Sequence, residues 1–111
     1  MIDKNVFSQL CDDVGEQLAL QLLGVYVSES RKQIADLNNT DCANTIRHIA
    51  HSLKSSSRSY GALLLAQTCE LIEMTSTHTD VTFKDLEPLI DKATSLSEDA
   101  FLEANKLITN K

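Results

Sequence analysis

The organisation of the chain is clearest between residues 42 and 58, where the sequence runs CANTIRHIAHSLKSSSR. If this stretch is helical, with about 100° of rotation per residue, its side chains divide between two opposite faces. One face carries apolar side chains, including Ile46, Ile49 and Leu53, and the other is centred on His51. The side chains within about 60° of that histidine are polar or basic, namely Asn44, Arg47, His48, Lys54, Ser55 and Arg58. The pattern predicts an amphipathic helix with its apolar face in a core and its histidine face exposed.

Helical periodicity recurs on both sides of this stretch. The helices that it predicts span about residues 5–11, 15–37, 42–58, 61–74 and 85–108. No segment alternates between apolar and polar residues as a half-buried strand does. Amphipathic helices joined by short connections bury their apolar faces together in a bundle. The predicted fold is therefore all-α: an antiparallel four-helix bundle with a short extra N-terminal helix, forming a single domain over residues 1–111.

The start of the last helix has two possible N-caps. Thr82 and Asp85 resemble a capping box, with Asp where Glu is preferred. Asp85 as the N-cap explains Pro88 better, because the proline then lies in the first turn, where its missing N–H costs nothing. We therefore expect the helix to begin at Asp85.

Composition excludes several classes of protein. The 111 residues are 42% hydrophobic, which is too apolar for a disordered chain, and the net charge of −6 disfavours binding to nucleic acid. No apolar run approaches the ~18 residues of a membrane span, and the N-terminus lacks the apolar core of a signal peptide. Cys11, Cys42 and Cys69 are odd in number and widely spaced. They predict buried thiols in a reducing compartment, and therefore a cytoplasmic protein.

The charges are unevenly distributed along the chain. Between Cys42 and Cys69 the sequence contains Arg47, Lys54 and Arg58 but no Asp or Glu, so all 16 acidic residues lie elsewhere. A solvated helix face usually mixes both signs, because opposite charges at i,i+4 stabilise it. We interpret these cations, which have no acidic partner on their own helix, as a site for an anion. A neutral imidazole can accept a phosphoryl group, and Lys54, one turn beyond His51, can neutralise a phosphoryl oxygen.

Other chemistries have weaker support in the sequence. His48 and His51 are spaced i,i+3 and can present two nitrogens to a metal, but the remaining histidine, His78, lies in a polar segment without a second pair. The three serines that follow Lys54 lack a nucleophile elbow, which disfavours serine hydrolysis. The chain also lacks a glycine-rich phosphate loop, which disfavours ATP binding. We therefore predict no metal site.

Residues 49–62, which read IAHSLKSSSRSYGA, resemble the signature of histidine-containing phosphotransfer (HPt) domains. The resemblance continues through the next helix at Leu65, Ala66, Cys69, Ile72 and Glu73. It implies that His51 is the phosphorylated histidine and that Lys54 lies near the phosphoryl group. It also implies that Gly61 and Ala62 are small residues that let the next helix pack closely.

One position departs from the family pattern. The family usually has glycine directly after the lysine, and this chain has Ser55. Its hydroxymethyl group can either crowd the imidazole or donate a hydrogen bond to the phosphate. The sequence Lys54-Ser55-Ser56 also resembles, more weakly, the small free-standing HPt proteins of bacterial quorum-sensing relays.

The resemblance implies a carrier of phosphoryl groups, rather than an independent kinase, that works between two receiver domains. The expected partners are the receiver domain of a hybrid sensor kinase and a response regulator, with no nucleic acid or membrane, and we expect a monomer. The chain needs no cofactor of its own, because Mg²⁺ belongs to the receiver. We predict a docking face of Arg47, His48, Ser55, Arg58 and the exposed Leu64. The alternative is a non-phosphorylated adaptor that binds receiver domains, although an adaptor needs neither His51 nor Lys54.

Overall fold

The computed structural model of the chain describes residues 1–110. Within that range the chain forms five α-helices and no strand: α1 (Lys4–Val14), α2 (Glu16–Asn38), α3 (Ala43–Ser59), α4 (Leu63–Thr75) and α5 (Phe83–Thr109). The predicted all-α class is confirmed. Lys111, the last residue of the predicted domain, lies outside the described residues. None of the described helices is both long and apolar enough to cross a membrane.

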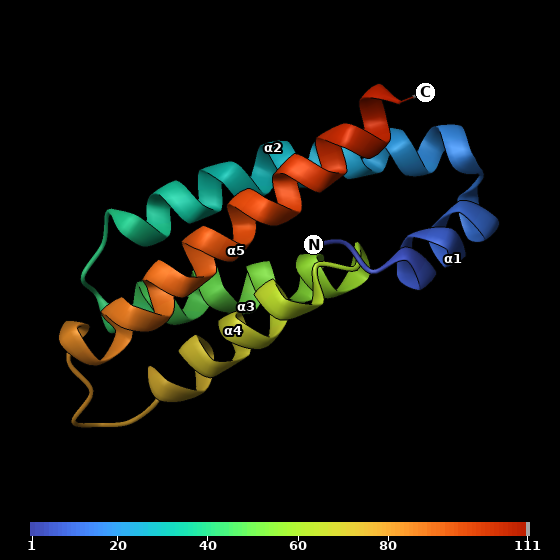
Figure 1. Cartoon of the computed structure of the whole chain (residues 1–111). Coiled ribbons are helices and arrows are strands. Elements are labelled where there is room, and N and C mark those ends of the chain that lie inside the picture. Colours follow the sequence, from blue (N-terminus) through green and yellow to red (C-terminus); the bar gives the residue numbers. More distant parts are fainter. Residues whose placement is uncertain (111) are drawn as a thin grey trace.

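Helices α2 to α5 run alternately in opposite directions along a molecule that measures 47 × 20 × 17 Å (Figure 1). The short α1 lies at one end, close to the turn that joins α3 to α4. The arrangement is the antiparallel bundle with an additional N-terminal helix that the sequence predicts.

The start of α5 differs from the prediction. The helix begins at Phe83, and Thr82 rather than Asp85 is its N-cap. The Asp85 carboxylate accepts hydrogen bonds from the Thr82 amide at 2.8 Å and from the Thr82 hydroxyl at 3.1 Å. The Thr82 side chain in turn accepts from the Asp85 amide, which completes a reciprocal capping box, and Pro88 lies in the second turn of the helix.

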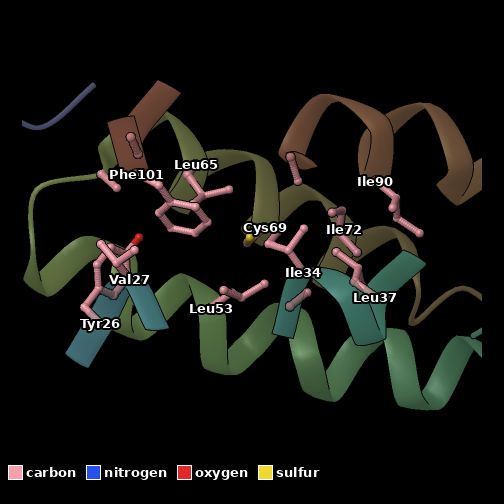
Figure 2. Packing of buried hydrophobic residues seen from close by; sticks show 14 of the residues in the cluster. Tyr26, Val27, Ile34, Leu37, Leu53, Leu65, Cys69, Ile72, Ile90 and Phe101 are labelled. Carbon is pink, nitrogen blue, oxygen red and sulfur yellow. The ribbon is translucent and has the colours of Figure 1, made fainter. Parts of the chain in front are cut away.

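The core is one cluster of apolar side chains from the four long helices, and Figure 2 shows its central part. Tyr26 of α2 stacks on Tyr60 with ring centroids 4.9 Å apart and meets Phe101 of α5 edge-on at 6.2 Å. Its hydroxyl forms a buried hydrogen bond of 2.8 Å with Ser57 of α3. Burial raises the pKa of Tyr26 to about 12. Tyr26 therefore remains a neutral phenol that joins three segments of the bundle.

The three cysteines occupy different environments. Cys69 is buried in the core (Figure 2), and burial raises the pKa of its thiol to about 12. Cys11 is half-buried and Cys42 is exposed. The expectation of buried thiols is therefore wrong for Cys42, which is the N-cap of α3 and lies exposed after the connection from α2, and it holds only in part for Cys11.

Gly61 forms the tight turn between α3 and α4. Its φ of +84° lies in the left-handed region, which side chains other than glycine rarely adopt. A Cβ at this position would stand 3.0 Å from the carbonyl oxygen of Asp3, whose amide donates to the Gly61 carbonyl at 2.8 Å. The structure thus corrects the role implied for Gly61. The segment that packs closely on it is the N-terminal one, whereas Ala62 is buried and caps α4.

The substitution Gly61→Ala should lower the free energy of unfolding by about 2–4 kcal/mol, because it combines a left-handed backbone with a collision against Asp3. The same substitution at Gly24, in the interior of α2, is the control. A Cβ added at Gly24 would have its nearest neighbour, Ile108 Cδ1, at 3.8 Å. Gly24→Ala should therefore raise the free energy of unfolding by up to ~1 kcal/mol, because alanine has the higher helix propensity. Urea denaturation of both variants tests this. Equal stability of Gly61→Ala and the wild type would contradict the packing role.

Candidate functional site

The candidate site lies on the exposed ridge of α3, between α2 and α4. Ile46, Ala50 and Leu53 on the opposite side of the helix are buried, as the amphipathic pattern predicts. The side chain of His51 stands on the ridge with 65% of its surface exposed. A partner can therefore reach its imidazole without any rearrangement of the fold.

Glu73 of α4 joins the two central residues of the site. Its carboxylate contacts His51 Nδ1 at 2.6 Å through Oε2 and Lys54 Nζ at 2.6 Å through Oε1. The pKa of Glu73 is lowered, mainly because Lys54 donates a hydrogen bond to its carboxylate. Partial burial raises this pKa, but the contact with His51 lowers it further. Glu73 is therefore an ionised carboxylate at neutral pH.

The contact with Glu73 determines which nitrogen of His51 is free. An ionised carboxylate can only accept hydrogen bonds, so the proton lies on Nδ1 of His51. In the neutral imidazole the lone pair is then on Nε2, and this nitrogen is the one available as a nucleophile. The arrangement of a nucleophile oriented by a neighbouring carboxylate suits the formation of a covalent intermediate.

The other cations of α3 also have partners. Arg58 lies 3.6 Å from Glu70 of α4, and Arg47 donates a hydrogen bond to Asn44 within α3. These cations have no acidic partner on their own helix, as the sequence indicates, but Lys54 and Arg58 are nevertheless paired in the folded protein. Their acidic partners come from the neighbouring helix, which a comparison of charges along one helix does not detect.

Glu73 and Glu70 are site residues that the sequence reasoning did not identify, although Glu73 belongs to the motif that carries the family resemblance. Their i,i+3 spacing places both on one face of α4. Combined with an antiparallel pairing of α3 and α4, that spacing would have indicated that they face His51, Lys54 and Arg58.

The remaining predicted residues are not all brought together. His48 and Ser55 are exposed on α3 close to His51 along the ridge. Leu64 is 55% exposed, but nine residues separate it from Glu73, which places it about half a turn around α4 from the histidine side. His78 lies in the connection between α4 and α5. Among residues 1–110, no group of three or more His, Cys, Asp or Glu residues is arranged to hold a metal ion.

Comparison with known proteins identifies the family. Residues 21–104 match the family model of the Hpt domain. The crystal structure of histidine-containing phosphotransfer protein B (HptB) from Pseudomonas aeruginosa PAO1 is similar in fold, with a TM-score of 0.87. The two sequences are 22% identical, and the similarity covers 99% of this chain and 96% of that one. No curated protein matches the chain. Because the family model spans most of the sequence and includes the helix that carries His51, the chain belongs to the Hpt domain family, whose role is histidine phosphotransfer in two-component signalling.

Proposed function

We propose that the chain is a phosphorelay intermediate that accepts a phosphoryl group on Nε2 of His51. The donor is an aspartyl phosphate in the receiver domain of a hybrid sensor kinase, and the acceptor is an aspartate of a response regulator. The chain acts in the cytoplasm as a monomer without a cofactor of its own, while Mg²⁺ is supplied by the receiver. The observation that carries the proposal is the hydrogen bond from His51 Nδ1 to Glu73, which leaves Nε2 as the nucleophilic nitrogen of an exposed side chain.

Each bond that forms in the proposed transfer is matched by a bond that breaks, and the charge that develops on the imidazole has a partner at the site. The lone pair of His51 Nε2 forms a bond to phosphorus, while the bond from phosphorus to the aspartyl oxygen breaks and its electron pair returns to the receiver's carboxylate. The imidazole keeps its proton on Nδ1 and becomes positively charged. The ionised Glu73, 2.6 Å away, stabilises that charge. Reversal of the same step on a second receiver releases the phosphoryl group.

Lys54 is the proposed neutralising group for the phosphoryl oxygens. Its side chain is 19% exposed, and Glu73 holds its ammonium close to His51. Lysine is a flexible point charge with three donors, so it can retain Glu73 and reach a phosphoryl oxygen with another N–H. Arg47 and Arg58 add positive charge along the same ridge, which favours encounter with the acidic pocket of a receiver.

Replacement of the candidate phosphoacceptor tests the proposal. The full chain is incubated with phosphoramidate, a small phosphoryl donor that needs no partner protein, and phosphohistidine is detected by ³¹P NMR. Wild type should be phosphorylated, and His51→Gln should not. The control is His78→Gln, an exposed histidine in the α4–α5 connection, which should react as wild type does.

A panel of isolated receiver domains, labelled on their aspartates with ³²P-acetyl phosphate in the presence of Mg²⁺, then separates a relay from an adaptor. A relay takes the label from at least one receiver. Receivers that bind the chain without losing label to it would instead support the non-phosphorylated adaptor.

The substitution Glu73→Gln should slow phosphorylation of His51 by phosphoramidate about 10- to 100-fold, the effect of losing a hydrogen bond to a charged group. The glutamine amide can present a donor to Nδ1 and so favour the wrong tautomer. Glu87→Gln, at an exposed position on α5, is the matched control and should have no effect. An unchanged rate in Glu73→Gln would show that the carboxylate does not orient the ring.

Acid should weaken the contribution of Glu73 to stability. The pKa of Glu73 is lower in the folded protein than in the unfolded chain. The ionised carboxylate therefore contributes its full stabilisation at pH values above the pKa of the unfolded chain, and this contribution is lost as the pH falls through the pKa of the folded protein. In urea denaturation, the difference in unfolding free energy between wild type and Glu73→Gln should be largest near neutral pH and shrink below about pH 4. A difference that is constant with pH would refute the ion-pair assignment.

A further inference from the structure

The second half of α3 is rich in serine, at positions 52, 55, 56, 57 and 59. Four of these hydroxyls are engaged within the protein. Those of Ser52 and Ser57 form hydrogen bonds with side chains of α2, and those of Ser56 and Ser59 donate to carbonyls one turn earlier in α3. Of the five, all of which lie in the described part of the chain, only Ser55 has a hydroxyl without a hydrogen-bond partner.

Ser55 lies close to the reacting nitrogen. It follows His51 by four residues, so the two side chains are neighbours on the same exposed ridge, with Cβ atoms about 5–6 Å apart. The Cα–Cβ bonds of a helix all tilt toward its N-terminus, so the hydroxymethyl group of Ser55 lies over the turn that carries His51. Ser55 is exposed, and its hydroxyl can rotate toward a group bound on the ridge.

The two sides of the His51 ring face different surroundings. Glu73 holds Nδ1 on the side of α3 that faces α4, where Lys54 also lies. Because the two ring nitrogens point in different directions, Nε2 points away from the Glu73 carboxylate. On the helical projection Ser55 lies about 40° from His51 on the side away from α4, and Lys54 about 60° from it on the α4 side.

We propose that the hydroxyl of Ser55 donates a hydrogen bond to the phosphoryl group on Nε2 of His51. This inference rests on the proposed function and assigns a positioning role to a residue that differs from the glycine usual in the family. The hydroxyl stabilises the phosphorylated form from the side opposite Lys54, so the chain holds its phosphoryl group between a cation and a neutral donor. It breaks no internal hydrogen bond to do so, because the Ser55 hydroxyl has none within residues 1–110.

The equilibrium of phosphoryl exchange measures this contact. The full chain is mixed with the receiver domain of the labelled panel that exchanges phosphate fastest with wild type, and the ratio of phosphohistidine to aspartyl phosphate is determined at equilibrium. At equilibrium this ratio depends only on the relative stability of the two phosphorylated proteins, so a change in the rate of docking does not alter it. Ser55→Ala should shift the equilibrium about five- to tenfold toward the receiver, the effect of one lost hydrogen bond.

Three further variants separate the contact from a purely steric effect. Ser55→Thr keeps the hydroxyl and should restore the wild-type equilibrium to within about twofold. Ser59→Ala, whose hydroxyl donates to the Ser55 carbonyl at 3.1 Å, is the matched serine control and should leave the equilibrium unchanged. If Ser55 only crowds the ring, Ser55→Ala and Ser55→Gly will accelerate exchange in both directions without moving the equilibrium, and the proposal is overturned.

A measurement without a partner distinguishes failure of this contact from failure of the proposed function. In the chain phosphorylated with phosphoramidate, the ³¹P resonance of phosphohistidine should shift in Ser55→Ala and return toward the wild-type position in Ser55→Thr. An identical resonance in all three proteins overturns the Ser55 contact alone. A wild-type chain that forms no phosphohistidine overturns both the contact and the relay.

Discussion

The turn at Gly61 is the constraint on which the site depends. Its left-handed backbone reverses the chain between α3 and α4, and the Asp3 backbone packs against it at a distance that excludes a side chain. His51 lies ten residues before this turn and Glu73 twelve residues after it. With about 1.5 Å of rise per residue in both helices, the two side chains reach nearly the same level along the bundle. The turn thereby places the carboxylate beside the imidazole and Lys54.

The contact between the two helices explains how one histidine can be both exposed and oriented. A side chain that is 65% exposed has few packing contacts to hold its ring. The Glu73 carboxylate supplies the missing restraint at Nδ1 and leaves Nε2 free. Because Lys54 binds the same carboxylate, the charge that orients the histidine also keeps a cation next to it. Orientation and electrostatic stabilisation therefore come from a single side chain of the neighbouring helix.

The distribution of charge has a different meaning in three dimensions than along the sequence. The net charge of −6 still disfavours nucleic acid as a partner. Along the chain, the segment around His51 is free of acidic residues, which suggests an isolated positive surface. In the folded protein Glu70 and Glu73 reach that surface from α4 and pair with Arg58 and Lys54. The site is thus a mixed network of charges, in which Arg47 is the one Lys or Arg side chain of α3 without an acidic partner within residues 1–110.

The helices, the buried face of α3 and the exposure of His51 could be predicted from the amino-acid sequence, because they follow from the period of 3.6 residues and the burial of apolar side chains. The motif around His51 also determined the family. The contact of Glu73 with the imidazole, the packing of Gly61 on the N-terminal segment and the position of Leu64 away from the site became apparent in the folded structure alone. Each of these features depends on the register between segments that are distant in sequence, and the periodicity of a single helix contains no information about that register. The capping box of Thr82 was visible in the sequence, but its energy relative to the preference of Pro88 for a first turn was not.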